Sequence, residues 1–166
     1  MTETAAPKSS RRLALVLIVA AVVLVVDQAT KFWAESALAG HAPIPVLGKF
    51  LQFRLLYNPG AAFSIGTNYT WIFAILAAVA VVVLFRLATQ PQPIGRAIAL
   101  ALLLGGAFTH LLDRLFRAPG FARGHVVDFI DYNGWFVGNV ADIALAVGAC
   151  LFVLLSFRPA HSPADH

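Results

Sequence analysis

Charged residues are scarce in this chain, and cysteine is almost absent. The 166 residues include 12 Lys and Arg and 8 Asp and Glu, or 12% charged, while 60% are hydrophobic. Soluble domains carry about 25% charged residues, so this composition excludes an ordinary soluble fold. The basic residues form no run or stripe, which argues against a nucleic-acid partner. The single cysteine, Cys150, excludes an internal disulfide.

Long apolar runs take up most of the sequence. Each has about the 20 residues that a hydrocarbon layer of about 30 Å requires of a helix, and they cover residues 13–33, 69–87, 94–112 and 135–157. The sequence therefore predicts an all-α membrane protein with four transmembrane helices, built as a single polytopic domain over residues 1–166. The polar or Pro/Ala-rich tails, 1–12 and 158–166, are expected to be disordered.

The connectors between these runs differ in character. The short connector 90–93 predicts an antiparallel hairpin of the second and third helices, so the connectors 36–68 and 115–134 fall together at the other end. In the first of these, apolar side chains alternate with mostly polar ones over residues 51–58, as in a half-buried strand, and the Asn-Pro-Gly sequence that follows is typical of a turn. Residues 125–132 are rich in branched and aromatic side chains and are expected to pair with this strand. We therefore expect a small extracytoplasmic β-sheet or loop region beside the helices.

The orientation of the chain rests on its N-terminal basic residues. Lys and Arg are equally numerous on the two sides of the predicted helices, so their overall count does not decide the orientation. Lys8, Arg11 and Arg12 directly precede the first apolar run and favour a cytoplasmic N-terminus. Four helices then place the C-terminus in the cytoplasm and the sheet region at the extracytoplasmic face.

The intramembrane carboxylates gather in one layer. With this orientation, Asp27 lies near the outer end of the first apolar run, Asp113 at the outer end of the third, and Asp142 in the outer part of the fourth. Asp128 lies in the outer connector. A helix starting at Trp135 places Asp142 roughly 10 Å below the surface. A carboxylate inside a spanning helix costs about 2.5–3.5 kcal/mol and is by default a functional residue. If Asp128 folds down to meet Asp142, the two can share a proton and act as acid and base, as in aspartyl hydrolases.

Other interpretations of these residues remain open. Asp142 could cap a helix or pair with Arg114, and Asp27 and Lys31, four residues apart, could form an ordinary ion pair. Asn58 and Gly60 could serve only as a turn, although glycine also lets another backbone approach closely.

A metal site is a further alternative. His110 and Asp113 share a helical face, and His125 is near Asp128 in the sequence. This spacing matches no known ligand motif, so we predict no metal ion.

Two functional classes fit the intramembrane aspartates. One is a peptidase, and the other is a small proton- or cation-coupled transporter that uses these aspartates along its pathway. A transporter needs polar groups through the whole depth of the membrane, whereas the inner halves of the four apolar runs carry no carboxylate. Hydrolysis needs access from one side only, so the pattern favours the peptidase.

A series of short motifs resembles one known family. In order, the motifs are Asp27–Lys31, Asn58–Ser64, Gly105–Ala107, Asp113–Arg114, Val126–Ile130 and Asn139–Asp142. Their types and order resemble lipoprotein signal peptidase (signal peptidase II), and the resemblance covers residues 13–157. It implies a multi-pass aspartyl endopeptidase of the bacterial cytoplasmic (inner) membrane that works without a cofactor. Such enzymes remove signal peptides from prolipoproteins by cutting before the diacylglyceryl-modified cysteine. The implied partners are prolipoprotein substrates and membrane lipid, and we expect a monomer.

The resemblance also implies roles for individual residues. Asp128 and Asp142 match the catalytic pair. The other matched or neighbouring positions are expected to bind substrate or support the site, and these are Asp27, Lys31, Asn58, Gly60, His110, Asp113, Arg114 and Asn139.

The chain departs from the family pattern in three places. His110 stands where the family usually has Asn, three residues before the Asp-Arg pair. The connector between Arg114 and Val126 is longer than in many members. Gly138 and Ile143 replace the Phe and Ser that often flank the Asn-Val-Ala-Asp motif.

Overall fold

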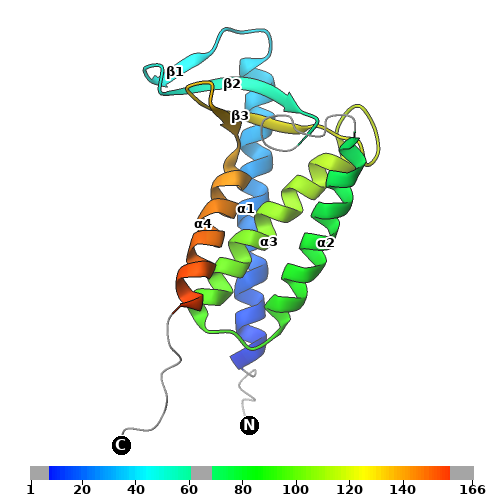
Figure 1. Cartoon of the computed structure of the whole chain (residues 1–166), viewed down its shortest axis with the longest axis vertical. Coiled ribbons are helices and arrows are strands. Elements are labelled where there is room, and N and C mark those ends of the chain that lie inside the picture. The colour runs from blue at the N-terminus through cyan, green and yellow to red at the C-terminus, as the bar shows by residue number, and fades with distance from the viewer. Residues whose placement is uncertain (1–7, 61–68, 158–166) are drawn as a thin grey trace, which may run out of the picture.

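A computed structural model of the chain describes residues 8–60 and 69–157. Within these ranges the chain forms four helices and four strands: α1 (Lys8–Leu38), β1 (Ile44–Leu47), β2 (Leu51–Asn58), α2 (Thr70–Thr89), α3 (Ile94–Phe116), β3 (Val126–Tyr132), β4 (Phe136–Gly138) and α4 (Val140–Ser156). The helices alternate in direction, so α1 begins and α4 ends at the same end of the molecule, and the sheet lies at the other end (Figure 1).

Three of the four helices are long and apolar enough to cross a membrane, namely α1, α2 and α3. The fourth, α4, is apolar but has 17 residues. The structure thus bears out four helices in the predicted order, with three candidate membrane spans.

Helix α1 extends beyond the predicted range at both ends. It has 31 residues, or about 46 Å at 1.5 Å per residue, which exceeds a hydrocarbon layer of about 30 Å. Residues 8–12 are helical, so the prediction that they belong to a disordered tail was wrong. Arg11 and Arg12 are good helix formers and continue the helix ahead of its apolar part. The predictions for residues 1–7 and 158–166, and for the end of the Asn58–Ser64 motif, lie outside the described residues.

The prediction that a helix begins at residue 135 was wrong. Asn133 and Gly134 both have positive φ, 56° and 76°, and the Trp135 N–H donates to the Tyr132 carbonyl at 3.1 Å. An Asn-Gly pair with two positive φ angles forms the tight turn that suits a β-hairpin. The chain therefore turns back as β4, and α4 begins at Val140. The predicted depth of Asp142, roughly 10 Å below the surface, was therefore also wrong. It assumed a helix from Trp135, whereas Asp142 lies in the first turn of α4.

The four strands form one antiparallel sheet in the order β1-β2-β3-β4. The predicted pairing of β2 with β3 is confirmed, and Asn58 lies opposite Val126. The sheet packs on the projecting end of α1 through a buried cluster of Ala34, Leu38, Phe129 and Ile130. This packing fixes the height of β3, which carries Asp128, relative to the helices.

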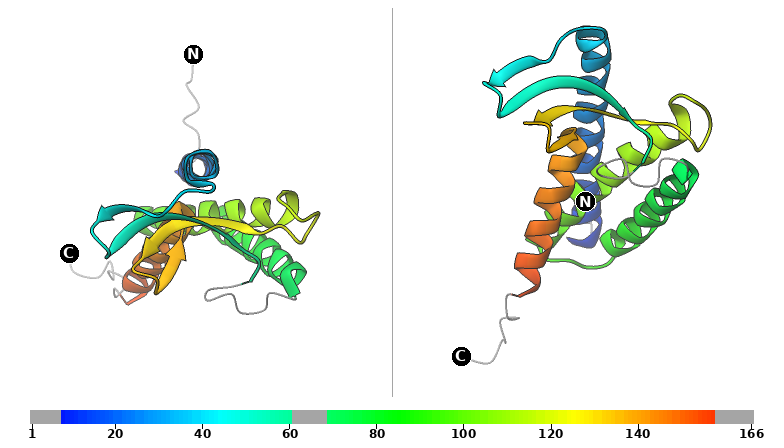
Figure 2. Two further views of the ribbon diagram at one scale, coloured as in Figure 1. Left: turned by 90° about the horizontal axis from the view of Figure 1, so that it is seen from above. Right: turned by 45° about the horizontal axis from the view of Figure 1, so that its top comes forward.

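Helix α3 occupies the centre of the helical layer. Seen from above, α1 lies on one side of α3, and α2 and α4 lie on the other (Figure 2). Two adjacent glycines allow this close packing, because a Cβ on Gly105 would stand 2.8 Å from the Val23 Cβ and one on Gly106 would stand 2.6 Å from the Leu145 Cγ. Small residues let helix backbones approach closely within a membrane.

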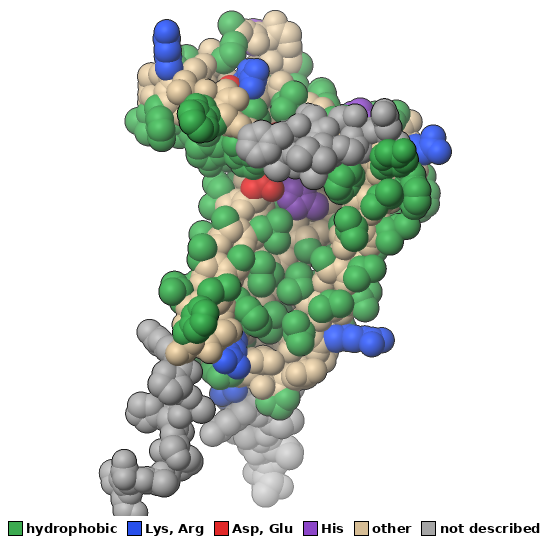
Figure 3. Space-filling model, in the orientation of Figure 1, with side chains coloured by type: hydrophobic (Ala, Val, Ile, Leu, Met, Phe, Trp, Pro, Cys, Tyr) green, Lys and Arg blue, Asp and Glu red, His purple; other side chains and the backbone are tan. Residues whose placement is uncertain are grey.

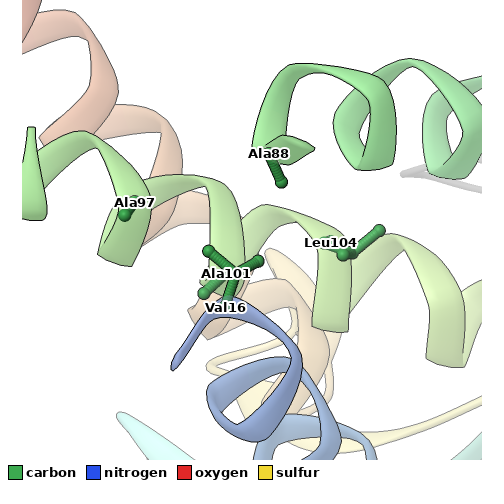
Figure 4. Packing of buried hydrophobic residues seen from close by; sticks show 5 residues of the cluster. All are labelled: Val16, Ala88, Ala97, Ala101 and Leu104. Carbon is green, nitrogen blue, oxygen red and sulfur yellow. The ribbon is translucent and has the colours of Figure 1, made fainter. Parts of the chain in front are cut away.

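Away from the sheet, the helices pack through apolar side chains. One buried cluster joins α1, α2 and α3, with Val16 lying against Ala101 and with Ala88 pointing toward α3 (Figure 4). The cluster comprises Val16, Ala88, Ala97, Ala101 and Leu104. These contacts hold α1, α2 and α3 together away from the sheet.

Candidate active site

A cavity of about 300 Å³ lies where the sheet meets the helices. Its polar lining consists of Asn58, His110, Arg114, Asp128 and Asp142, and its apolar lining includes residues of α2 and β4. In the space-filling view, acidic and histidine side chains come together near the sheet end of a face that is otherwise mostly hydrophobic (Figure 3). The cavity thus brings together six of the residues that the sequence singled out, since Gly60, which directly follows β2, also lines it.

Asn139 links the two central carboxylates of this cavity. Its side-chain Nδ2 donates to Asp128 Oδ1 at 2.6 Å. Its backbone N–H donates to Asp142 Oδ2 at 3.0 Å, and its Oδ1 accepts from the Asp142 N–H at 3.1 Å. The last two bonds form a capping box at the start of α4. A single residue therefore ties the strand that carries Asp128 to the helix that carries Asp142.

Asp128 is almost completely buried, with 2% of its surface exposed. Burial raises the pKa of Asp128 to about 6, and the nearby charge of Asp142 acts in the same direction. Hydrogen bonds from Asn58 and Asn139 act in the opposite direction, because each donates to one carboxylate oxygen, at 3.0 and 2.6 Å. Asp128 thus binds its proton more tightly than an ordinary aspartate.

Asp142 is more accessible, with 30% of its side chain exposed. Its Oδ2 takes part in the helix cap, and its Oδ1 lies 3.1 Å from His110 Nε2. The interpretation of Asp142 as a helix cap is therefore correct in itself, and the carboxylate also faces the cavity. The alternative pairing with Arg114 is not present among the bonds of this residue.

Arg114 binds backbone carbonyls. Its guanidinium donates to the carbonyl of Asn58 at 3.0 Å, to that of Gly124 at 3.1 Å, and to that of Gly60. The same group lies over the Phe73 ring, 5.4 Å from its centroid. Arg114 therefore fastens the end of β2 and the connector before β3 to helix α3.

A second group of charges lies on the other side of α3, fully buried. Lys31 Nζ lies 2.6 Å from Asp27 Oδ2 and 2.7 Å from Asp113 Oδ2. The predicted ion pair of Asp27 with Lys31 is thus confirmed, and Asp113 extends it. Because Asp113 faces α1 while His110 faces α4, these two residues do not converge, contrary to the shared face that the sequence indicated. They lie 3 positions apart on α3, and α1 and α4 pack on opposite sides of this helix, so each residue contacts a different helix.

The buried carboxylates also reach the backbone beside the cavity. Asp27 Oδ1 accepts from the Ala141 N–H at 2.9 Å, one residue before Asp142. Asp113 Oδ2 accepts from the Val127 N–H at 3.5 Å, one residue before Asp128. The residue before each central carboxylate, Ala141 before Asp142 and Val127 before Asp128, therefore donates its backbone N–H to a buried aspartate.

Several members of this buried group were not predicted from the sequence. Thr109 donates to Asp27 Oδ2 at 2.5 Å, and Gln28 donates to Asp113 Oδ1 at 2.9 Å. Arg117 donates to Asp113 Oδ1 and to Glu35 Oε1, both at 2.7 Å. One signal was available, because Arg117 follows Asp113 by four residues on a helix. The contacts of Thr109 and Gln28 run between helices and leave no such signal.

The chain is similar in sequence to one family of known proteins. A family model described as "Signal peptidase (SPase) II" matches residues 19–158. A lipoprotein signal peptidase of Streptomyces griseus is 45% identical over 153 residues, which cover 92% of this chain and 78% of that protein. One of Mycobacterium avium is 45% identical and shares 88% of this chain and 80% of its own length. One of Mycobacterium tuberculosis is 44% identical over 93% of this chain and 76% of that protein.

Two solved structures have a similar fold, and both are described as bacterial membrane enzymes. The first superposes with a TM-score of 0.78 at 24% identity and covers 92% of this chain and 95% of the other. The second has a TM-score of 0.75 at 25% identity, with 89% and 95% covered.

Proposed function

This chain belongs to the signal peptidase II family, and from that premise we propose that it is a membrane aspartyl endopeptidase acting on prolipoproteins. Its relatives are named lipoprotein signal peptidases, which supports a substrate that carries a signal peptide before a lipid-modified cysteine. The proposed reaction is hydrolysis of the peptide bond before the diacylglyceryl-modified cysteine.

One observation carries the aspartic mechanism: Asp128 and Asp142 line the same cavity, and Asn139 binds both. Two carboxyl groups that share one proton can deprotonate a water and protonate the carbonyl oxygen of the peptide bond. The buried Asp128, with its pKa raised to about 6, binds a proton more tightly than an ordinary aspartate, so we assign the shared proton to it when the pair is protonated. The more exposed Asp142 then takes the proton of the attacking water, and the roles exchange as the intermediate collapses.

The remaining site residues position this pair or the substrate. Asn58 and Asn139 orient the Asp128 carboxylate through its two oxygens. Arg114 holds the carbonyls of Asn58 and Gly60 at the cavity edge, where an extended substrate backbone would pass. The buried Asp27, Lys31 and Asp113 act from behind, through backbone N–H groups next to the catalytic pair.

The topology we propose has four spans, both termini in the cytoplasm and the sheet at the extracytoplasmic face of the bacterial inner membrane. Two observations support it: the alternating helices put the described ends of α1 and α4 together, and the sheet and cavity lie at the opposite end. With 17 residues, α4 spans about 25 Å, so the hairpin before it lies near the membrane surface. We propose that the protein works as a single-domain monomer without a cofactor.

The transporter alternative is not favoured. A transport pathway needs a polar route to both sides, whereas the buried cluster away from the sheet, with Val16, Ala101 and Leu104, is apolar.

The deciding experiment is cleavage of a diacylglyceryl-modified precursor by the purified protein. Asp128→Asn and Asp142→Asn should each reduce the rate by about 10²–10⁴-fold or more, because an amide neither accepts nor donates the shared proton. Asp131→Asn is the matched control, since Asp131 lies on the same strand but pairs with Arg54 outside the cavity. Wild-type turnover by either dyad variant would exclude the aspartic mechanism, and failure of the wild type to cleave would exclude the function.

A further inference from the structure

Among the described residues, His110 makes a side-chain contact to Asp142 from helix α3. We propose that His110 is a positioning residue of the catalytic pair: its imidazole holds Asp142 through Oδ1 and, when protonated, keeps that carboxylate ionised. This inference rests on the proposed function, because it takes Asp142 as half of the catalytic pair.

The geometry makes the contact specific to one oxygen. His110 Nε2 lies 3.1 Å from Asp142 Oδ1, while Asp142 Oδ2 is held by the Asn139 N–H at 3.0 Å. The carboxylate is thus fixed at both oxygens, from α3 and from the helix cap. Both partners remain partly exposed to the cavity, at 19% and 30% of their side chains, so water can reach the pair.

The position of His110 on α3 follows from the helix repeat. Gly106, His110 and Arg114 are spaced four residues apart and form one stripe that faces α4 and the cavity. Gly106 allows α4 to come close, which brings Asp142 within reach of the imidazole. A shorter Asn side chain at residue 110 would also present an N–H group from this stripe.

Charge separates His110 from such an Asn. Neutral imidazole with its proton on Nε2, imidazolium, and an amide all donate a hydrogen bond to the carboxylate. Of these three donors, the imidazolium alone adds a positive charge, and histidine gains it between about pH 5 and 8. His110 therefore opposes protonation of Asp142 as the pH falls, whereas Asn does not.

The charged and titratable groups around His110 come from each element that lines the cavity. Asp128 faces it from β3, Asp142 from α4, and Arg114 from its own helix, while the lining residues of α2 are Phe73 and Ala77. The Arg114 guanidinium donates its hydrogen bonds to backbone carbonyls. The protons of Asp128, Asp142 and His110 are therefore coupled, and the pH–rate profile reports the three together.

The test compares pH–rate profiles of kcat/KM for wild type, His110→Asn and His110→Leu on one lipid-modified precursor. In His110→Asn the rate on the acid side of the profile should be lower than in wild type by up to about tenfold, because the variant lacks the cation that favours the Asp142 carboxylate. His110→Leu should lose activity over the whole range, because it removes the donor to Oδ1 as well. His41→Asn, at an exposed histidine after α1, should keep the wild-type profile.

The outcomes separate this inference from the function on which it rests. A wild type that does not cleave the precursor overturns both. If the wild type is active and His110→Asn shows the same pH profile, the role of the imidazolium charge is overturned alone, and wild-type activity of a folded His110→Leu overturns the positioning role. His110→Asn decides the charge effect even if His110→Leu does not fold, and thermal unfolding of each variant establishes which case applies.

Discussion

Helix α3 carries two polar clusters on neighbouring stripes, and they differ in every respect that matters for chemistry. The stripe of Gly105, Thr109 and Asp113 faces α1 and contributes to a closed cluster with Asp27 and Lys31. The stripe of Gly106, His110 and Arg114 faces α4 and contributes to the open cluster around Asp128 and Asp142. The same kinds of side chain, one residue apart along the helix, therefore face different neighbours.

In the closed cluster, each charged side chain is paired with an opposite charge inside the protein. Asp27 and Lys31 are 0% exposed and Asp113 is 1% exposed, and the lysine lies between the two carboxylates. The open cluster leaves one carboxylate partly exposed to a cavity of about 300 Å³. Burial with complete pairing produces a rigid support, and burial with incomplete pairing produces a group whose proton is available. The following predictions test this difference.

The largest effect is expected from Lys31→Met. This substitution leaves Asp27 and Asp113 as buried carboxylates without their shared cation, which costs about 3–5 kcal/mol of folding free energy. Thermal unfolding in detergent should show a large drop in Tm, and the fraction that remains folded should also lose activity, since both carboxylates position backbone next to the catalytic pair. Lys49→Met, at an exposed lysine, is the matched control. A wild-type Tm for Lys31→Met would refute the supporting role of the closed cluster.

Much of the fold and of the two clusters could be predicted from the sequence, because residue spacing and hydropathy indicate them. The helix order, the pairing of β2 with β3, and the ion pair of Asp27 with Lys31 follow from periodicity. The two catalytic candidates were found from the rarity of carboxylates in apolar runs and from the family motifs.

The remainder depended on packing that a single chain segment does not encode. The start of α4 was misplaced because Phe136 and Val137 fit an apolar helix as well as a strand, and the Asn133-Gly134 turn that decides the matter was overlooked. The separation of His110 from Asp113 depends on which helix lies on which side of α3. That arrangement is a tertiary fact, and neither residue signals it.

The second prediction concerns the stability of the open cluster against pH. Because the pKa of Asp128 rises from 3.8 to about 6 on folding, the folded protein binds this proton more tightly than the unfolded chain does. Stability from this residue is therefore greatest at low pH, falls between about pH 4 and 6, and stays reduced above that range. The cost at neutral pH is on the order of 3 kcal/mol.

Asp128→Asn removes that cost along with the activity. The variant should unfold at a higher temperature than wild type near pH 7.5, with the difference shrinking as the pH falls toward about 4. Thermal unfolding of both proteins over this range measures the difference, and groups that the two share cancel. A difference that does not change with pH would show that Asp128 is not held in a proton-binding environment.

A small effect is expected at the rim of the closed cluster. Glu35 pairs with Arg117 at 2.7 Å, but 26% of its side chain is exposed. Exposed pairs contribute about 0–1 kcal/mol, so Glu35→Gln should change the free energy of unfolding by less than about 1 kcal/mol. Asp113 keeps its bonds from Lys31, Gln28 and Arg117 in this variant. If Glu35→Gln lost as much folding free energy as Lys31→Met, Glu35 would belong to the closed cluster despite its exposure.

The smallest effect is expected from removing metal ions. Both oxygens of Asp128 accept amide N–H groups, and those of Asp142 face the Asn139 N–H and His110. Such donors suit carboxylates that exchange protons, whereas a cation needs lone pairs free of N–H partners. Dialysis against EDTA should therefore leave the cleavage rate of the lipid-modified precursor unchanged, with Asp142→Asn giving the inactive baseline. A loss that added zinc restores would make the open cluster a metal centre, and its contrast with the closed cluster would then be one of ligand binding instead of proton sharing.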